Sequence, residues 1–549
     1  MALTKVSYSM IAGAAINVLD YGADPSGVAD STAAIQLAFD QRGKIYLPTG
    51  TYKITSSLTL YGNTEVFGDG PGLSILRGSG FTSGQLIQDS SRVTSTDINL
   101  NIVLRDFEID CNSYAVGTSS GIIFYRVGNL LIDNLYIHDC GSTALRWGQS
   151  YADTINITVS NCRFERGRVG DATQGIGRFV TIMNCYAYSF GDTCYATVAD
   201  FNATTNPLGL APQNVTFDNC TAVGDWVNGV FTGSGGSAQL GFGFGPYAIT
   251  ANLYLTVSNC ICENLFANLW AVVFNKLKLT NNYFKAHSNT STGGVRLDGI
   301  STAVIEGNTF ENSFVAAGPD YQSLLLQASR FIYGSSNFDA DIKFVTITGN
   351  IFQNNSNPAV QFNLDPTYAL ISNIVLSSNV FIGTNEPLQF SPVTSSGTGV
   401  IDLVKISDNS VNSAAAALVG VSGSPEQYTN FQVVDNNIGA VPVATGSVAP
   451  YLFVVNTHKI QVPSVPSGVA TTIYTLGSDY HTLQITACVQ TTNQAYSAIA
   501  EIVNNGGSSR IAWQSNGANF TITLSGLDVQ VTQSGIGTQT VTAVIEFTS

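Results

Sequence analysis

The chain is poor in charged side chains, and in basic ones most of all. Asp, Glu, Lys and Arg make up only 11% of its 549 residues, against roughly 25% in an ordinary globular protein. The chain has 22 basic and 37 acidic residues, and its net charge is −15. A chain this acidic offers no basic surface to neutralise phosphates, so we expect no nucleic-acid partner.

Long apolar runs and metal-ligand spacings are missing as well. No stretch reaches the ~18 apolar residues of a membrane span, and the N-terminal MALTKVSYSMIAGAA lacks the basic region that opens a Sec signal peptide. The four His residues are scattered, and the close pair Cys260 and Cys262 has no second pair near it. We therefore expect no membrane insertion, no structural metal and no cofactor.

What the chain does contain favours β-structure. Its 53 Gly residues supply tight turns, and β-branched and aromatic residues recur along the whole length. A chain of 549 residues is also long for one compact core. We expect either several domains or one elongated repeat.

One short motif recurs and decides between these alternatives. Two apolar residues alternate with polar ones, a turn residue follows, and then Cys or Asn opens another strand. Copies include ITVSNCRF from Ile157, VTFDNCTA from Val215, LKLTNNYF from Leu277 and VTITGNIF from Val345. The apolar period is two, as in strands, and most copies are about 22–30 residues apart, which is one coil of a three-sheet solenoid.

The aligned copies share one inward-facing column. Its members are Phe107, Leu135, Cys162, Cys185, Cys220, Cys260, Asn282, Asn308, Asn350, Asn379, Asn409 and Asn437. The residue before the column is usually Asn or Gly, which tolerate a left-handed bend. We predict a stack of thiols followed by a ladder of hydrogen-bonded amides. Four of the nine cysteines then act as buried apolar fillers, which weakens the alternative that they form disulfides.

The first coils carry a more specific pattern. Residues 17–36 read NVLDYGADPSGVADSTAAIQ, and 43–52 read GKIYLPTGTY. Asp30-Ser31-Thr32, followed by Ile35 and Phe39, predicts a helix of about ten residues that caps the open end of the solenoid. These segments resemble the opening of the pectate-lyase-like superfamily, and the junction from Thr4 resembles that of phage tailspikes and capsule depolymerases. The resemblance covers residues 4–440.

The resemblance implies a right-handed parallel β-helix, side-by-side assembly into a homotrimer, and a glycan groove on the outer face. It also implies a place on the phage tail, where the protein would adhere to and depolymerise a bacterial capsule or O-antigen polysaccharide. We expect a neck or attachment peptide at 1–16, the β-helix at 17–445, and a C-terminal β-sandwich at 451–549. Alternating strands with Gly, Asn and Ser turns predict the sandwich, whose expected role is trimerisation, with sugar binding as the alternative.

Long insertions mark where the chemistry should lie. The intervals 185–220, 220–260 and 308–350 are longer than the others, and the first two are rich in Gly and aromatic residues. Function in a solenoid gathers on lengthened coils. We therefore place the groove around residues 165–300. Trp226, Trp270, Tyr195 and Tyr247 are candidates to stack on sugar rings or to pack in the core. Arg168 and Arg178 flank a Gly-rich turn and are candidates to hold an anionic sugar or to be plain surface charges.

Three acids are the main catalytic candidates. Asp192 and Asp225 each follow Gly at a strand end on successive coils, and Glu263 points outward three residues after Cys260. Glycosidases use two carboxyl groups ~5–5.5 Å apart for retention or ~6.5–9.5 Å for inversion, and coils stack at ~4.8 Å. We expect two of the three to form an acid–base pair, one with a raised pKa. For each, the alternative is an ordinary surface acid.

Several other charged residues are weaker candidates. Lys285 shares the outward column of Glu263 and is a candidate to pair with it, and Asp218 is interpreted as an ordinary sheet-surface residue. The remaining acids are Glu165, Glu311, Asp298 and Asp320.

Three functions stay open at this stage. The first is endo-glycosidic hydrolysis by a phage tailspike. The second is β-elimination by a lyase on a uronate, and the third is a non-cleaving adhesin. A secreted pectinase is disfavoured by the N-terminus.

Overall fold

The computed structural model describes most of the chain. The described ranges are 14–91, 99–115, 117–148, 155–175, 177–197, 214–227, 230–233, 237, 239–244, 254–272, 275–286, 294–312, 323–333, 336–354, 358–364, 370–384, 386–392, 400–412, 417–422, 428–438, 444–445, 453–454, 456–465, 471–475, 481–490, 495–504, 509–515, 520–525, 528–533 and 539–548.

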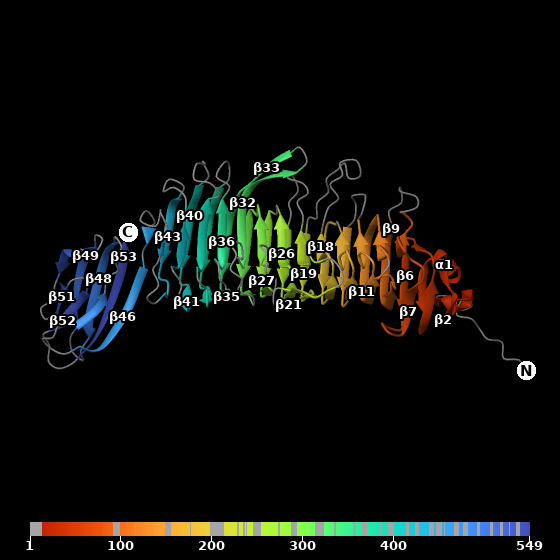
Figure 1. Cartoon of the computed structure of the whole chain (residues 1–549), viewed down its shortest axis with the longest axis horizontal. Coiled ribbons are helices and arrows are strands. Elements are labelled where there is room, and N and C mark those ends of the chain that lie inside the picture. Colours follow the sequence, from red (N-terminus) through yellow and green to blue (C-terminus); the bar gives the residue numbers. More distant parts are fainter. Residues whose placement is uncertain are drawn as a thin grey trace, which may run out of the picture.

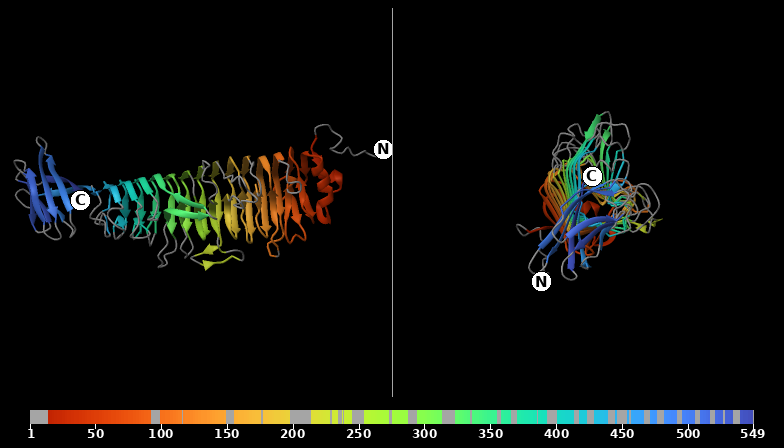
Figure 2. Two further views of the ribbon diagram at one scale, coloured as in Figure 1. Left: turned by 90° about the horizontal axis from the view of Figure 1, so that it is seen from above. Right: turned by 90° about the vertical axis from the view of Figure 1, so that its left-hand side faces the viewer.

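The molecule is an elongated solenoid whose coils stack along one axis (Figures 1 and 2). Its strands pair in parallel with the equivalent strands of the coils before and after, in three ladders, of which the first two are continuous through β9 and β11. The all-β, three-sheet parallel β-helix predicted from the repeat is confirmed.

Ladder 1 carries the strand that precedes the inward column. It comprises β1 (Ile16–Asn17), β3 (Gly43–Leu47), β6 (Thr64–Gly68), β9 (Asn99–Asp110), β11 (Val127–Cys140), β13 (Ile155–Ser160), β16 (Val180–Met183), β19 (Asn214–Asp218), β24 (Tyr254–Ser258), β27 (Lys276–Thr280), β30 (Thr302–Glu306), β34 (Ile342–Thr348), β37 (Leu370–Ser377), β40 (Val400–Ser407), β43 (Tyr428–Val434) and β45 (Phe453–Val454).

Ladder 2 follows the bend and includes the second halves of β9 and β11. Its other strands are β2 (Ser26–Asp30), β4 (Gly50–Ile54), β7 (Ser74–Gly78), β14 (Arg163–Gly167), β17 (Tyr186–Phe190), β20 (Thr221–Val223), β25 (Ile261–Leu265), β28 (Tyr283–Ala286), β31 (Thr309–Asn312), β35 (Ile351–Gln353), β38 (Val380–Ile382) and β41 (Ser410–Asn412).

Ladder 3 closes each coil. It comprises β5 (Leu58–Leu60), β8 (Gln85–Asp89), β10 (Ser120–Phe124), β12 (Leu145–Trp147), β15 (Thr173–Gly175), β18 (Thr193–Thr197), β23 (Leu240–Phe244), β26 (Ala267–Val272), β29 (Val295–Asp298), β32 (Leu324–Tyr333), β36 (Val360–Leu364), β39 (Leu388–Pro392), β42 (Val419–Val421) and β44 (Ala444–Thr445). Two antiparallel hairpins branch from the coils: β21 (Trp226–Val227) with β22 (Val230–Phe231), and β32 with β33 (Ser336–Ala340).

The bend between ladders 1 and 2 follows from the residue before the column. Asn161, Asn184, Asn219, Asn259 and Asn281 all have φ between 51° and 55°, in the left-handed region that Asn tolerates better than most residues. Gly307 and Gly349 take the same place with φ of 66° and 64°. The bend aims the next side chain at the axis, as predicted.

The inward column changes its chemistry along the solenoid, also as predicted. Cys162, Cys185, Cys220 and Cys260 are each at most 2% exposed. From Asn282 on, each amide Nδ2 donates to the Oδ1 of the next Asn, for example at 3.0 Å from Asn308 to Asn350.

The last member of the column was predicted one residue too late. Asn436, not Asn437, accepts from Asn409 at 2.9 Å. The left-handed residue in this coil is Asp435 (φ 52°), and the residue directly after it must turn inward.

The two ends of the solenoid differ. Helix α1 (Thr32–Asp40) lies beside the N-terminal coils, packs on the 3₁₀ turn η2 (Val18–Tyr21) and on β5, and buries Ile35 and Phe39 (Figure 1). None of the helices in the described ranges is long and apolar enough to span a bilayer.

Two antiparallel sheets lie at the other end. One comprises β46 (Asn456–Val465), β53 (Gln539–Thr548), β48 (His481–Gln490), β49 (Ala495–Asn504) and β50 (Ser509–Ser515); the other comprises β47 (Thr471–Thr475), β52 (Asp528–Gln533) and β51 (Phe520–Ser525).

Candidate functional site

Three Asp residues occupy the corner between ladders 2 and 3 on successive coils. Each follows a Gly: Gly170-Asp171, Gly191-Asp192 and Gly224-Asp225. We call Asp171, Asp192 and Asp225 the aspartate row. The Thr193 amide donates to the Asp171 carboxyl at 3.0 Å, and the Asp192 amide donates to the Gly170 carbonyl at 3.3 Å. Asp192 and Asp225 were predicted from this Gly-Asp signal; Asp171 carries the same dipeptide but was not among the predicted residues.

Asp171 and Asp192 are an electrostatically unequal pair. Asp171 is only 3% exposed, and burial together with the charge of Asp192 raises its pKa to about 8. Burial also raises the pKa of Asp192, but this side chain keeps exposed surface, so water should weaken the effect. This raised pKa favours the protonated form of Asp171 at neutral pH, and Asp192 is the accessible member of the pair.

Asp225 is a buried carboxylate held by neutral donors. It is 9% exposed, and its Oδ2 accepts from the Ser189 hydroxyl at 2.6 Å and from the Gln239 amide at 2.8 Å. Burial, the Asp225 charge and a hydrogen bond to Asp225 raise the pKa of Tyr188. The amide of Leu240, the residue after Gln239, donates to the Asp192 carbonyl at 2.7 Å, which places Asp225 one coil on from Asp192.

Glu263 lies beside this corner rather than in it. It is half-buried on the outer side of β25, in register with Val223, which precedes Asp225 by two residues. Its outward direction agrees with the alternation expected from Cys260.

The outer side of ladder 2 next to the row carries a cluster of charged and aromatic side chains. His138 contacts Asp139 through Nδ1 at 2.8 Å and Glu108 through Nε2 at 3.2 Å. Burial lowers the pKa of His138, but these hydrogen bonds and the nearby carboxylate charges outweigh it and raise the pKa to about 9. The Tyr136 ring stacks on His138 at 4.4 Å, and its hydroxyl donates to Glu165 at 2.6 Å.

This cluster is continuous with the aspartate row. His138, Glu165 and Tyr188 are register neighbours on three coils, and Tyr188 is the residue bonded to Asp225. His138 was not among the site residues predicted from the sequence. The alternation in YIHD, which puts Tyr136 and His138 on one face, was the signal that could have found it.

One group of described residues has ligand atoms close enough for a metal ion. These atoms of Asp110, His138 and Asp139 lie within 4.8 Å of one another. Arg77 already donates to Asp110 at 2.7 Å, and His138 uses both ring nitrogens. A cation would have to displace these partners, so the set fits an ion-pair cluster better than a metal centre.

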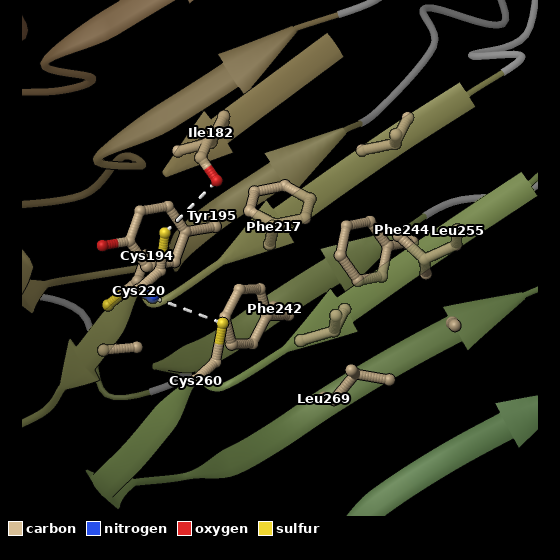
Figure 3. Close-up of a cluster of buried hydrophobic side chains, with 14 of the residues drawn as sticks. Ile182, Cys194, Tyr195, Phe217, Cys220, Phe242, Phe244, Leu255, Cys260 and Leu269 are labelled. Carbon is tan, nitrogen blue, oxygen red and sulfur yellow. Dashed lines mark hydrogen bonds between the residues drawn. The ribbon is translucent and has the colours of Figure 1, made fainter. Parts of the chain in front are cut away.

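The aromatic candidates divide between core and surface. Tyr195 is fully buried and stacks on Phe242 at 5.2 Å (Figure 3), so its proposed contact with sugar is wrong. Residue 195 pairs in register with Thr173, an inward position on ladder 3. Trp226 is 8% exposed and donates to the Ser237 carbonyl at 2.9 Å. Tyr247 lies outside the described residues.

Trp270 is the accessible aromatic candidate. It is 40% exposed on β26, and its indole N–H donates to Asp298 at 2.9 Å. The Arg296 guanidinium lies 5.2 Å from the ring centroid and also bonds to Asp298. Burial raises the pKa of Asp298. The indole is thus held in one orientation with part of its surface free.

The remaining candidates have structural partners or are not described. Arg168 donates to the Gly117 carbonyl at 2.9 Å, which ties two coils together. Arg178 is half-buried in the turn after β15. Lys285 contacts Glu311 at 3.6 Å, and Asp218 accepts from Ser258 and Asn259 on the sheet surface. Asp320 lies outside the described residues.

Comparisons with known proteins agree with this architecture. Residues 15–225 match the family model "Rhamnogalacturonase A/epimerase, pectate lyase-like". The pre-neck appendage protein of Bacillus phage phi29 is 28% identical over 182 residues, which are 32% of this chain and 20% of that protein. The chain thus matches only about a fifth of the length of this phage relative. The plasmin and fibronectin-binding protein A of Streptococcus pneumoniae is 25% identical over 442 residues, 74% of this chain and 54% of its own.

Solved structures share the fold at low identity. A tailspike mutant of E. coli bacteriophage HK620, in complex with a pentasaccharide, has a TM-score of 0.50 at 13% identity, covering 97% of this chain and 94% of its own. The catalytic unit of an α-1,3-glucanase from Streptomyces thermodiastaticus has a TM-score of 0.51 at 14% identity, covering 82% and 72%.

Residues 15–225 are thus similar to the pectate-lyase-like family, and the described coils form a parallel β-helix. The family model, the phage relative and the shared fold confirm the resemblance drawn from residues 17–52.

Proposed function

We propose that this protein is a phage tailspike that binds and depolymerises a bacterial surface polysaccharide by endo-glycosidic hydrolysis. The observation that carries the proposal is the aspartate row, where Asp171 and Asp192, both with raised pKa values, lie on successive coils next to the coil of Asp225. A pair of carboxyl groups whose environments separate their pKa values is what glycoside hydrolysis requires.

In this proposal Asp192 is the general acid and Asp225 the carboxylate. Asp192 has a raised pKa and accessible surface, while Asp225 accepts hydrogen bonds from Ser189 and Gln239. They lie one coil apart, and a coil rises ~4.8 Å, which favours the retaining arrangement. Asp171 holds a proton beside Asp192, and Glu263 remains the third candidate.

Trp270 is proposed as the sugar-stacking platform. Its indole is partly exposed and fixed by Asp298 and Arg296, so stacking on the apolar side of a pyranose would immobilise little that is not already ordered. Trp226, Arg168 and Arg178 are retained as groove-wall residues that shape this face.

The location on the virion, the oligomeric state and the domain organisation are also proposals. The phage relative and the tailspike fold support a place on the virion tail, contact with capsule or O-antigen at the host surface, and a homotrimer. A neck at 1–16, an N-terminal capping role for α1, a β-helix at 17–445 and a C-terminal β-sandwich at 451–549 complete the proposed organisation.

A non-cleaving adhesin is the second candidate. The pneumococcal relative matches 74% of this chain, and it is named for binding plasmin and fibronectin. A lyase acting on a uronate is the third.

Incubation with a panel of purified bacterial capsules and O-antigens, followed by mass analysis of products, separates the three. We expect oligosaccharides with ordinary reducing ends. Unsaturated uronates would indicate a lyase, and binding without products would indicate an adhesin.

Single variants then test the site. Asp192→Asn and Asp225→Asn should each lower kcat by at least a hundredfold, since each removes one half of an acid–base pair. Asp218→Asn, a surface acid of ladder 1, is the matched control and should keep full activity. Full activity in both site variants would refute the assignment.

A further inference from the structure

Two cysteines outside the inward column face each other across adjacent coils. Cys111 directly follows β9, and Cys140 is the last residue of β11. Their sulfur atoms are 3.0 Å apart, and the Cys111 amide donates to the His138 carbonyl at 2.9 Å. Both are essentially fully buried.

The backbone geometry suits a covalent bond between them. Cys140 lies on β11, and Cys111 directly follows the neighbouring strand β9. The strands of a ladder are ~4.8 Å apart, and disulfides join Cα atoms roughly 4.4–6.8 Å apart. On the far side of Cys140 the register neighbour is Gly167, which has no side chain. Among the described residues, Cys140 therefore has no competing thiol at its register position on that side.

The cysteines of the inward column provide the contrast. Their thiols donate to the carbonyl two residues earlier in the chain, at 3.0 Å for Cys162, 3.2 Å for Cys185 and 3.1 Å for Cys260. The equivalent contact of Cys140, to the His138 carbonyl, is 3.8 Å. The thiol of Cys140 is thus nearer to the sulfur of Cys111 than to any carbonyl it could bond.

We propose that Cys111 and Cys140 are a disulfide site, which closes when the folded protein meets a small-molecule disulfide such as oxidised glutathione. This proposal is independent of the proposed function. The bond would join the coil that carries His138 and Asp139 to the preceding coil, which carries Glu108 and Asp110.

The reaction balances in two exchanges. One cysteine, as thiolate, attacks the oxidant's S–S bond, forms a mixed disulfide and releases one thiol. The second cysteine attacks the protein sulfur of that mixed disulfide and releases the second thiol. Two S–H bonds and the oxidant's S–S bond break, one protein S–S bond forms, and the oxidant leaves as two thiols carrying both electrons and both protons.

The reaction should be slow in the native state. Burial, Cys140 and the carboxylates of Asp110 and Asp139 raise the pKa of the Cys111 thiol, which disfavours the reactive thiolate. Access requires opening of the turn after Cys111, where Asn112 is exposed. A low concentration of urea should therefore accelerate the oxidation.

Peptide mapping of the full-length chain tests the site without any variant. Trypsin cuts after Arg105, Arg126 and Arg146, so Cys111 and Cys140 fall in separate peptides, 106–126 and 127–146, each with one cysteine. After incubation with oxidised glutathione and alkylation of free thiols, we expect these peptides as one linked species that a reductant splits. Peptides that stay unlinked after incubation in mild urea, or carry glutathione on each cysteine, would overturn the proposal.

Thermal unfolding supplies a second readout. The staple closes a loop between residues 29 apart, so the oxidised protein should melt several degrees above the reduced protein. Cys140→Ser should abolish both the link and the difference, whereas Cys162→Ser should keep both. Equal midpoints for oxidised and reduced wild-type protein would count against a staple.

Discussion

The two halves of the inward column fill the same buried position with different side chains. From Cys162 to Cys260 the stack consists of thiols that bond mainly to nearby carbonyls. From Asn282 to Asn436 it consists of amides, each bonded to the next coil through both its side chain and its backbone. In the thiol half, few side-chain hydrogen bonds of the column run from one column residue to the next. In the amide half, the column residues themselves are hydrogen-bonded from coil to coil.

Breaking the amide half should have the largest effect. Asn350→Ala removes the acceptor of the Asn308 backbone N–H and of one N–H of the Asn308 side chain, and it removes the side-chain donor to the Ile305 carbonyl, all in a dry interior. Each orphaned group costs about 1–3 kcal/mol, so we expect a loss of about 4 kcal/mol in the free energy of unfolding. Denaturant unfolding measures it, with Cys185→Ala as the matched thiol control at about 1–2 kcal/mol. Equal losses would contradict the contrast between the halves.

Cys260→Asn would extend the amide ladder by one coil, and its stability can be compared with that of Cys185→Asn. Cys260 already donates its backbone N–H to Asn282 at 2.9 Å, so the amide of Cys260→Asn has a partner on the next coil. Cys185→Asn places the same amide between Cys162 and Cys220, which offer only thiols. We expect Cys260→Asn to be more stable than Cys185→Asn by about 2 kcal/mol in parallel denaturant titrations. The opposite order would show that volume, and not hydrogen bonding, governs the column.

The charged cluster around His138, on the outer side of ladder 2, should make the stability of the protein depend on pH. The pKa of His138 rises from 6.5 to about 9 on folding, so its stabilising contribution is full below pH 6.5 and is lost as the pH rises through about 9. His138→Gln should be less stable than wild type at pH 6 by about 1 kcal/mol, with the difference closing by pH 10. Thermal midpoints across this range measure it. A constant gap would mean that His138 contributes through packing on Tyr136.

Much of the fold could be predicted because its signals are local in sequence. The left-handed Asn residues, the alternation of LKLT and the Cys or Asn after each bend are all read within a few residues. The error at Asn437 arose where three candidate turn residues, Asp435, Asn436 and Asn437, stand in a row. Only the backbone shows which of them takes the left-handed conformation.

The site was less predictable because it is assembled across coils. Gly-Asp dipeptides located Asp192 and Asp225, yet the burial that raises the pKa of Asp171 depends on the coils around it. Alternation alone did not show that Tyr195 points into the core. That direction comes from its register with Thr173 and Phe242 on neighbouring coils.

The sequence by itself determined the β-helix, the place of its bends and the change from thiols to amides, because each coil repeats one short pattern and stacking propagates it. The tertiary structure alone decided which charged groups meet, which aromatic side chains remain exposed, and that Cys111 lies against Cys140. These depend on residues far apart in the chain, since a contact across a rung joins positions separated by a whole coil whose length varies.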